Sequence, residues 1–96
     1  MLNSLVMAEA AKVSIQDAAE RLASLLQALP ADERRAKALY HLERLRLSVS
    51  ASHSEAVRFA AFTVNKIVHD AADWGAPVTA AMDALRSELH SHGHDF

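Results

Sequence analysis

The carboxyl-terminal sequence HSHGHDF, which begins at residue 90, holds the residues of this chain best suited to metal chemistry. Imidazole and carboxylate groups are ligands of Ni²⁺, Cu²⁺ and Zn²⁺, so one ion could be surrounded by His90, His92, His94 and Asp95. Gly93 interrupts the segment, however, and we expect residues 91–96 to form a mobile tail. Ordering such a tail costs about 1–2 kcal/mol per residue. We therefore predict incidental affinity for metals and no resident cofactor, with transition-metal binding or trafficking as the alternative function.

Another histidine, His69, stands four residues before Asp73 in a predicted helix. Residues at this spacing share one helix face, so the pair could supply two metal ligands. Two ligands are too few for a stable site, and a surface hydrogen bond or ion pair is the simpler interpretation. A phosphoryl-accepting role for His69 or for His41 is disfavoured, because Asp70 and Glu43 place negative charge close to these imidazoles.

Patterns that carry catalysis are missing from the sequence. It contains no glycine-rich phosphate loop and no Gly-x-Ser-x-Gly turn, although serines are frequent. The absence of cysteine excludes thiolate catalysis, disulfide bonds and cysteine-based zinc sites. No carboxylates are paired at a spacing that would indicate acid–base chemistry. We therefore predict that the protein is not an enzyme.

The composition indicates a small helical domain. The chain has 96 residues, enough for one domain, and 51% of them are apolar, mostly Ala, Leu and Val. With only two glycines and two prolines, this composition favours helices. A formal charge of -2 argues against nucleic acid as a partner. The sequence lacks a basic signal-peptide region and any run of about 18 apolar residues that could span a membrane, so we expect a cytoplasmic protein.

Proline and glycine divide the chain into three helical segments. In the first, residues 3–29, apolar residues recur at alternating spacings of three and four, which is the heptad pattern of coiled-coil-like packing. The residues of this seam are Ala8, Ala11, Ile15, Ala18, Leu22, Leu25 and Leu29. The opposite face, with Glu9, Gln16, Glu20 and Gln27, is expected to face solvent.

The second segment, residues 30–74, could form one long helix or two. An apolar stripe starts with Ala38, Leu42, Leu45 and Val49 and continues nearly in phase to Trp74. Ser52 and Glu55, however, have the spacing of a helix-capping box, which favours a break between residues 50 and 54. The third segment, residues 77–90, carries an amphipathic stripe of Val78, Ala81, Met82, Leu85 and Leu89.

The second segment is apolar on two faces. In AVRFAAFTVNKIV, residues 56–68, a helical projection puts Phe59 and Phe62 among charged residues, opposite the stripe that contains Val64. A helix that is apolar on two faces must be covered on both, and three helices of one chain are too few to do so. We therefore predict an interface made by Ala36, Tyr40, Leu47, Phe59, Phe62 and Lys66. A homodimer is the simplest assembly, while coverage within one monomer and a different protein partner are the alternatives.

These patterns predict an all-α fold, a small bundle of three to four helices completed by dimerisation. Residues 1–90 would form a single domain, followed by the tail at 91–96. The function that fits best is a non-catalytic interaction module, such as a regulator, an adaptor or a subunit stabiliser. It would act through self-association and protein binding, not through nucleic acid or membranes.

Overall fold

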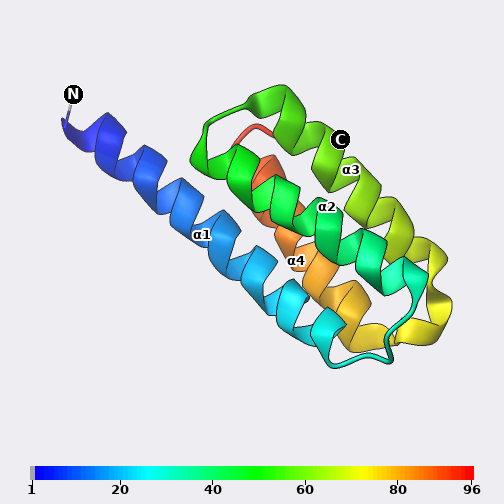
Figure 1. Cartoon of the computed structure of the whole chain (residues 1–96). Coiled ribbons are helices and arrows are strands. Elements are labelled where there is room, and N and C mark those ends of the chain that lie inside the picture. Colours follow the sequence, from blue (N-terminus) through cyan, green and yellow to red (C-terminus); the bar gives the residue numbers. More distant parts are fainter. Residues whose placement is uncertain (1) are drawn as a thin grey trace.

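A computed structural model describes the backbone of residues 2–96 and the side chains from Glu9 onward. The chain forms the α-helices α1 (Leu2–Gln27), α2 (Glu33–Ser50), α3 (Ser54–Asp70) and α4 (Ala76–Ser91), with a short 3-10 turn, η1 (Ala72–Trp74), before α4. No strand occurs within residues 2–96. The predicted all-α class is therefore confirmed, and the fold is a four-helix bundle (Figure 1).

The helices run alternately up and down and pack as a closed ring. α1 lies against α2 and α4, and α3 lies against the same two helices. The connections are short (Figure 1), as expected for antiparallel neighbours in a bundle. α1 has 26 residues against 18 in α2, and its first turns project beyond the end of the bundle (Figure 1). Over residues 2–96, none of these helices combines the length and the apolar character needed to cross a membrane.

The connection between α1 and α2 is fixed by polar groups at both helix ends. The carboxylate of Asp32 accepts a hydrogen bond from the backbone N–H of Arg35 at 2.8 Å and so caps α2. The Arg35 guanidinium donates in turn to the backbone oxygens of Gln27 at 3.2 Å and Leu29 at 2.7 Å. These bonds satisfy carbonyl groups that the end of α1 would otherwise leave unpaired.

The second predicted segment forms two helices, α2 and α3, separated by residues 51–53. Ser52 has a φ of 59°, a left-handed conformation in which a right-handed helix cannot continue. The break therefore lies where it was predicted. The predicted capping box does not form, because His53 precedes α3 and no side chain caps that helix. The reversal brings α2 and α3 into the most extensive helix contact of the bundle.

The predicted apolar stripes of α2 and α4 lie in the core, together with buried residues of α1 and α3. All of their members are buried: Ala38, Leu42, Leu45 and Val49 in α2, and Val78, Ala81, Met82, Leu85 and Leu89 in α4. In α3, Val64 and Val68 are buried and Ile67 is half-buried. No polar or charged side chain is buried among the described residues. The interior of the bundle is therefore filled by its own apolar side chains.

In α1 the predicted heptad seam is partly wrong. Its central members, Ile15, Ala18 and Leu22, are buried as predicted. Further along the helix, Leu26 is fully buried, whereas Leu25 is half-buried. Gln16, predicted to face solvent, is half-buried and donates from Nε2 to the backbone oxygen of Arg46 in α2 at 2.8 Å. Ala8 lies outside the described side chains. Because α1 packs against two helices at once, its buried face is wider than a two-helix seam.

Residues 91–96, predicted to be a mobile tail, lie folded back at the end of the bundle (Figure 1). The backbone N–H of His94 donates to the backbone oxygen of Leu89 at 2.9 Å. Phe96 packs partly buried against the core, with its ring edge-on to that of His90 at 5.1 Å between centroids. The Arg86 guanidinium lies 5.8 Å from the same ring. Through these contacts the tail lies against the end of the bundle. The predicted mobility of residues 91–96 stays a prediction.

Candidate functional site

The outward-facing sides of α2 and α3 carry large apolar side chains that the bundle leaves exposed. The exposed fractions are 58% for Tyr40, 62% for Leu47, 69% for Phe59 and 55% for Phe62. Ala36 and Lys66 are exposed on the same two helices. These six residues are called the α2–α3 surface below. Every residue predicted to form an interface is thus exposed and lies on one of two neighbouring helices.

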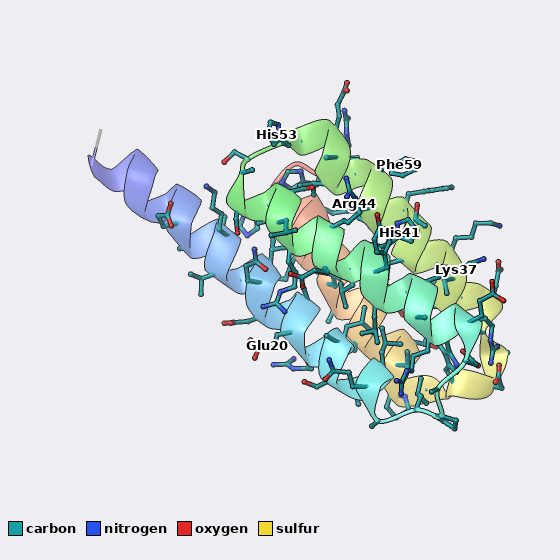
Figure 2. The ribbon with its side chains drawn as sticks, in the orientation of Figure 1. Glu20, Lys37, His41, Arg44, His53 and Phe59 are labelled. Atoms are coloured by element: carbon teal, nitrogen blue, oxygen red, sulfur yellow. The ribbon has the colours of Figure 1, made fainter. Side chains whose placement is uncertain are left out.

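Polar and charged groups border the α2–α3 surface. The Arg44 guanidinium lies 5.8 Å from the centroid of the Tyr40 ring, and the His41 imidazole meets the same ring edge-on at 5.1 Å. Figure 2 shows His41 and Arg44 of α2 on the same side of the molecule as Phe59 of α3. Two ion pairs flank these groups, Lys37 with Glu33 at 3.5 Å and Lys66 with Asp70 at 3.6 Å. Apolar groups bordered by both signs of charge resemble the core and rim of a protein interface.

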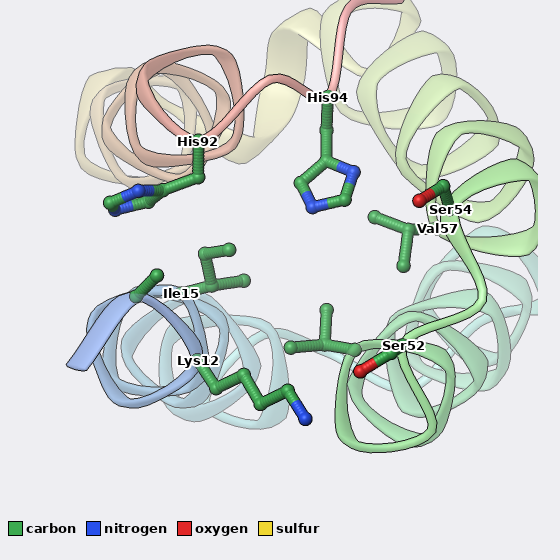
Figure 3. Close-up of a pocket in the computed structure, with 9 residues that line it drawn as sticks. Lys12, Ile15, Ser52, Ser54, Val57, His92 and His94 are labelled. Atoms are coloured by element: carbon green, nitrogen blue, oxygen red, sulfur yellow. The ribbon is translucent and has the colours of Figure 1, made fainter. Parts of the chain in front are cut away.

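The histidines predicted as metal ligands have separate partners. The His90 ring contacts Phe96, and Nε2 of His92 lies 3.7 Å from a carboxylate oxygen of Glu88. His94 points into a cavity at the end of the bundle (Figure 3). Within the described part of the chain, no three histidine, aspartate or glutamate side chains are grouped as a metal site requires. Metal binding by His90, His92, His94 and Asp95 would require the tail to leave these contacts, and it stays a prediction.

The side chains of His69 and Asp73 do not form the two-ligand pair that their spacing allows. α3 ends at Asp70, so Asp73 lies in η1, where its carboxylate binds Arg34 of α2. Nε2 of His69 lies instead 3.3 Å from Oδ1 of Asp83 in α4. Both side chains therefore link different elements of the bundle, in agreement with the simpler interpretation that each makes a surface hydrogen bond or ion pair.

A cavity of about 400 Å³ opens at the end of the bundle where the α2–α3 connection and the tail meet α1, and it is called the end cavity below. Its floor is apolar and includes the buried residues Ile15, Val49 and Val57. Its rim is polar and consists of Lys12, Ser52, Ser54, His92 and His94. Figure 3 shows the His94 imidazole pointing into the space above Ile15 and Val57. No sequence pattern indicated this cavity, because its lining comes from separate parts of the chain.

The electrostatic environment at His94 is positive. Burial lowers the pKa of the His94 imidazole, and repulsion from His92 in its protonated form and from the positive charge of Arg58 lowers it further. Among the residues with described side chains, nine line the end cavity, and none of these is acidic. Positive potential without a lining carboxylate favours an anionic group over a cationic one at the rim.

Comparisons with protein-family models, curated proteins and solved structures find no match to this chain. Its function is therefore inferred from two features of the structure, the α2–α3 surface and the end cavity.

Proposed function

We propose that this protein is a non-catalytic helical interaction module that associates with a second copy of itself through the α2–α3 surface. The observation that carries this proposal is the exposure of four large apolar side chains, those of Tyr40, Leu47, Phe59 and Phe62, on adjacent helices. Large apolar patches on a protein surface mark interaction sites. A dimer built in this way would serve as a regulator, an adaptor or a subunit stabiliser.

The size of these side chains supports an interface. A buried aromatic side chain contributes about 150–250 Å² of contact area. Each partner in a stable complex buries roughly 800 Å². The rings of Tyr40, Phe59 and Phe62, with Leu47 beside them, would supply a large share of that area. Aromatic residues and arginine are also enriched among the residues that dominate binding energy, and Arg44 lies over the Tyr40 ring.

The core of the bundle does not use these side chains. Leu42 and Leu45 of α2 and Val64 of α3 are buried, while the aromatic residues on the opposite sides of the same helices are exposed. Replacing an exposed aromatic residue by a polar one would therefore leave the core packing intact. Large apolar residues that do not contribute to the core favour a role in binding.

The charges around the α2–α3 surface favour a second copy as the partner. The ion pairs of Lys37 with Glu33 and of Lys66 with Asp70 place opposite charges side by side along both helices. In a two-fold dimer the same surface meets itself. A surface with one dominant sign of charge would repel its own copy, whereas a mixed surface does not. Nucleic acid, by contrast, would require concentrated positive charge.

Light scattering at micromolar protein concentration tests the proposal. We expect a mass of at least twice 10.4 kDa. A mass of 10.4 kDa at every concentration would overturn self-association. If the isolated protein is monomeric and a different protein co-purifies with it from its native host, the α2–α3 surface binds that partner instead.

A further inference from the structure

The end cavity combines an apolar floor with dimensions suited to a small ligand. Ile15, Val49 and Val57 are only 2%, 4% and 1% exposed, and all three line the cavity. The volume of about 400 Å³ falls within the ~300–1,000 Å³ of typical small-molecule sites. An apolar group bound on this floor would be transferred out of water. No buried polar side chain would have to move to make room for it.

The side chains of the floor indicate which kind of apolar group the cavity could bind. It is built from branched aliphatic side chains, and among the described lining residues the only rings are the imidazoles of His92 and His94 at the rim. Nucleobases and other flat aromatic groups are usually held by stacking on aromatic side chains. A floor of isoleucine and valine fits a flexible saturated chain better.

The rim restricts the head group. Lys12 carries a positive charge there, and His94 and His92 can donate hydrogen bonds (Figure 3). Two rim residues have carboxylate partners, Glu9 at 4.0 Å from Nζ of Lys12 and Glu88 at 3.7 Å from Nε2 of His92, and neither carboxylate is among the described residues that line the cavity. Donors and positive charge without a lining carboxylate are suited to an anion.

We propose that the end cavity binds a small aliphatic monocarboxylate, with its alkyl chain on the floor and its carboxylate at the rim, where Lys12 supplies positive charge on one side and His94 a hydrogen-bond donor on the other (Figure 3). Among the described residues, the Lys12 ammonium has two long contacts, 3.5 Å to the backbone oxygen of Ser50 and 4.0 Å to the carboxylate of Glu9, so it can turn to an anion. This site is separate from the α2–α3 surface and does not depend on self-association. Because α1, α3 and the tail all contribute to its lining, the ligand would also hold the tail against the bundle.

Titration calorimetry with decanoate, below the concentration at which it forms micelles, tests the proposal. Decanol has the same chain without the charge, and decyltrimethylammonium has the opposite charge. We expect saturable binding of one decanoate per chain, at least tenfold weaker binding of decanol, and no saturable binding of the cation. Decanoate should also raise the melting temperature, because a ligand that binds only the folded state stabilises it. In NMR spectra, the amide shifts of Val57 and His94 should change on binding.

Variants with matched controls locate the site. Ala11→Phe places a ring in the cavity wall and should abolish binding, whereas Ala10→Phe, at an exposed position one residue away, should not. Lys12→Gln should weaken decanoate binding about threefold to tenfold, and Lys37→Gln on α2 should leave it unchanged. Ser54→Glu adds a negative charge at the rim on an exposed residue. It should weaken binding even if Ala11→Phe fails to fold.

Three results would overturn the proposal. Equal binding of decanoate and decyltrimethylammonium would show that charge at the rim plays no part. Unchanged binding in Ser54→Glu and in a folded Ala11→Phe variant would show that the ligand lies elsewhere. Loss of binding in a variant with both Phe59→Ser and Phe62→Ser would show that decanoate adsorbs to the α2–α3 surface, a result that leaves self-association itself untouched.

Discussion

Arg34 and Asp73 form a two-pronged ion pair that joins the first turn of α2 to the η1 turn between α3 and α4. Nη1 and Nη2 of the guanidinium lie 2.7 Å and 2.8 Å from the two carboxylate oxygens of Asp73. Nη2 also donates to Asp32 at 3.0 Å, and the guanidinium lies 5.3 Å from the centroid of the Trp74 ring. Such parallel hydrogen bonds fix relative orientation as well as distance. The contact therefore holds the α1–α2 connection against the α3–α4 connection at one end of the bundle.

This ion pair predicts a pH dependence of stability. Its hydrogen bonds lower the pKa of Asp73 from 3.8 to about 2. A carboxylate whose pKa is lower in the folded state stabilises that state above its unfolded pKa, and the contribution is lost as the pH falls through the folded value. Asp73→Asn should therefore lower the melting temperature at pH 6, and the difference from wild type should shrink as the pH falls from 3.8 to about 2 and disappear only below that value. The difference should be small, because both side chains are partly exposed.

Melting curves of both proteins from pH 7 to pH 2 check this expectation. Asp17→Asn, which removes an exposed carboxylate of α1, is the control and should follow the wild-type profile. The pKa of Asp32 is also lowered, chiefly by the backbone N–H of Arg35. Asp32 is present in wild type and in both variants, so its own titration does not distinguish their melting curves. If Asp73→Asn differs from wild type equally at pH 6 and pH 2, its effect does not come from the ion pair.

Gly75, which links η1 to α4, predicts a specific backbone effect. Its φ of 92° and ψ of 166° lie in a region open almost only to glycine. A Cβ at this position would meet only the Cδ of Pro77 at 3.7 Å, an ordinary contact, so the cost of substitution lies in the backbone. Gly75→Ala should lower the free energy of unfolding by about 1–3 kcal/mol in urea denaturation. Gly93→Ala, also at positive φ but beyond α4, should cost less because the tail can shift. Equal costs would contradict this interpretation.

The sequence predicted the stripes of α2 and α4 correctly because each of these helices shows the regular spacing of a helix with one buried side. It predicted the exposure of Phe59 and Phe62 for the same reason, since a helical projection separates them from Val64. The Arg34–Asp73 pair was not predictable, because 39 residues separate its partners and only the folded topology brings them together. The end cavity was missed for the same reason, since its lining comes from several elements.

The error in α1 has a geometric cause. A seam with a strict seven-residue repeat drifts by about 20° per heptad on a straight α-helix. Over the length of α1 this drift moves Leu25 to the edge of the buried face and brings Leu26 to its centre. Leu26→Ala should therefore cost about 2–5 kcal/mol, because it opens a cavity in a filled core. Leu25→Ala should cost less than half as much in urea denaturation, because Leu25 is already partly in water. The reverse order would favour the heptad seam.

From the contacts of the three histidines at the end of the chain, we predict that the tail binds metal ions only weakly. His90 contacts Phe96, His92 lies beside Glu88, and His94 points into the end cavity. Gathering the three imidazoles on one ion would break these contacts and fix a new backbone course. Titration with Ni²⁺ and Zn²⁺ should therefore show affinity weaker than micromolar, lost on removal of residues 91–96. Sub-micromolar binding that disappears with the tail would favour the alternative function of metal binding or trafficking.

The α2–α3 surface predicts that assembly and folding respond differently to mutation. A variant with both Phe59→Ser and Phe62→Ser removes two exposed rings and leaves the buried stripe of α3 in place. Its helices should persist by circular dichroism, while sedimentation should show a weaker assembly, since a few aromatic residues carry most of the energy of an interface. Val13→Ser is the control, because Val13 is 56% exposed on α1, away from the proposed interface, and its loss should leave assembly unchanged.

Concentration dependence distinguishes loss of an interface from loss of a fold. If folding and association form one equilibrium, the melting temperature rises with protein concentration. Weaker association then moves the transition to lower temperature at a given concentration, and high protein concentration should restore stability to the Phe59→Ser, Phe62→Ser variant. A core variant such as Leu26→Ala loses stability at every concentration, because its cavity is present in each subunit whether or not the subunits meet. A double-serine variant with wild-type assembly and wild-type melting behaviour would show that Phe59 and Phe62 are tolerated surface residues. The proposed self-association would then lose the observation that carries it.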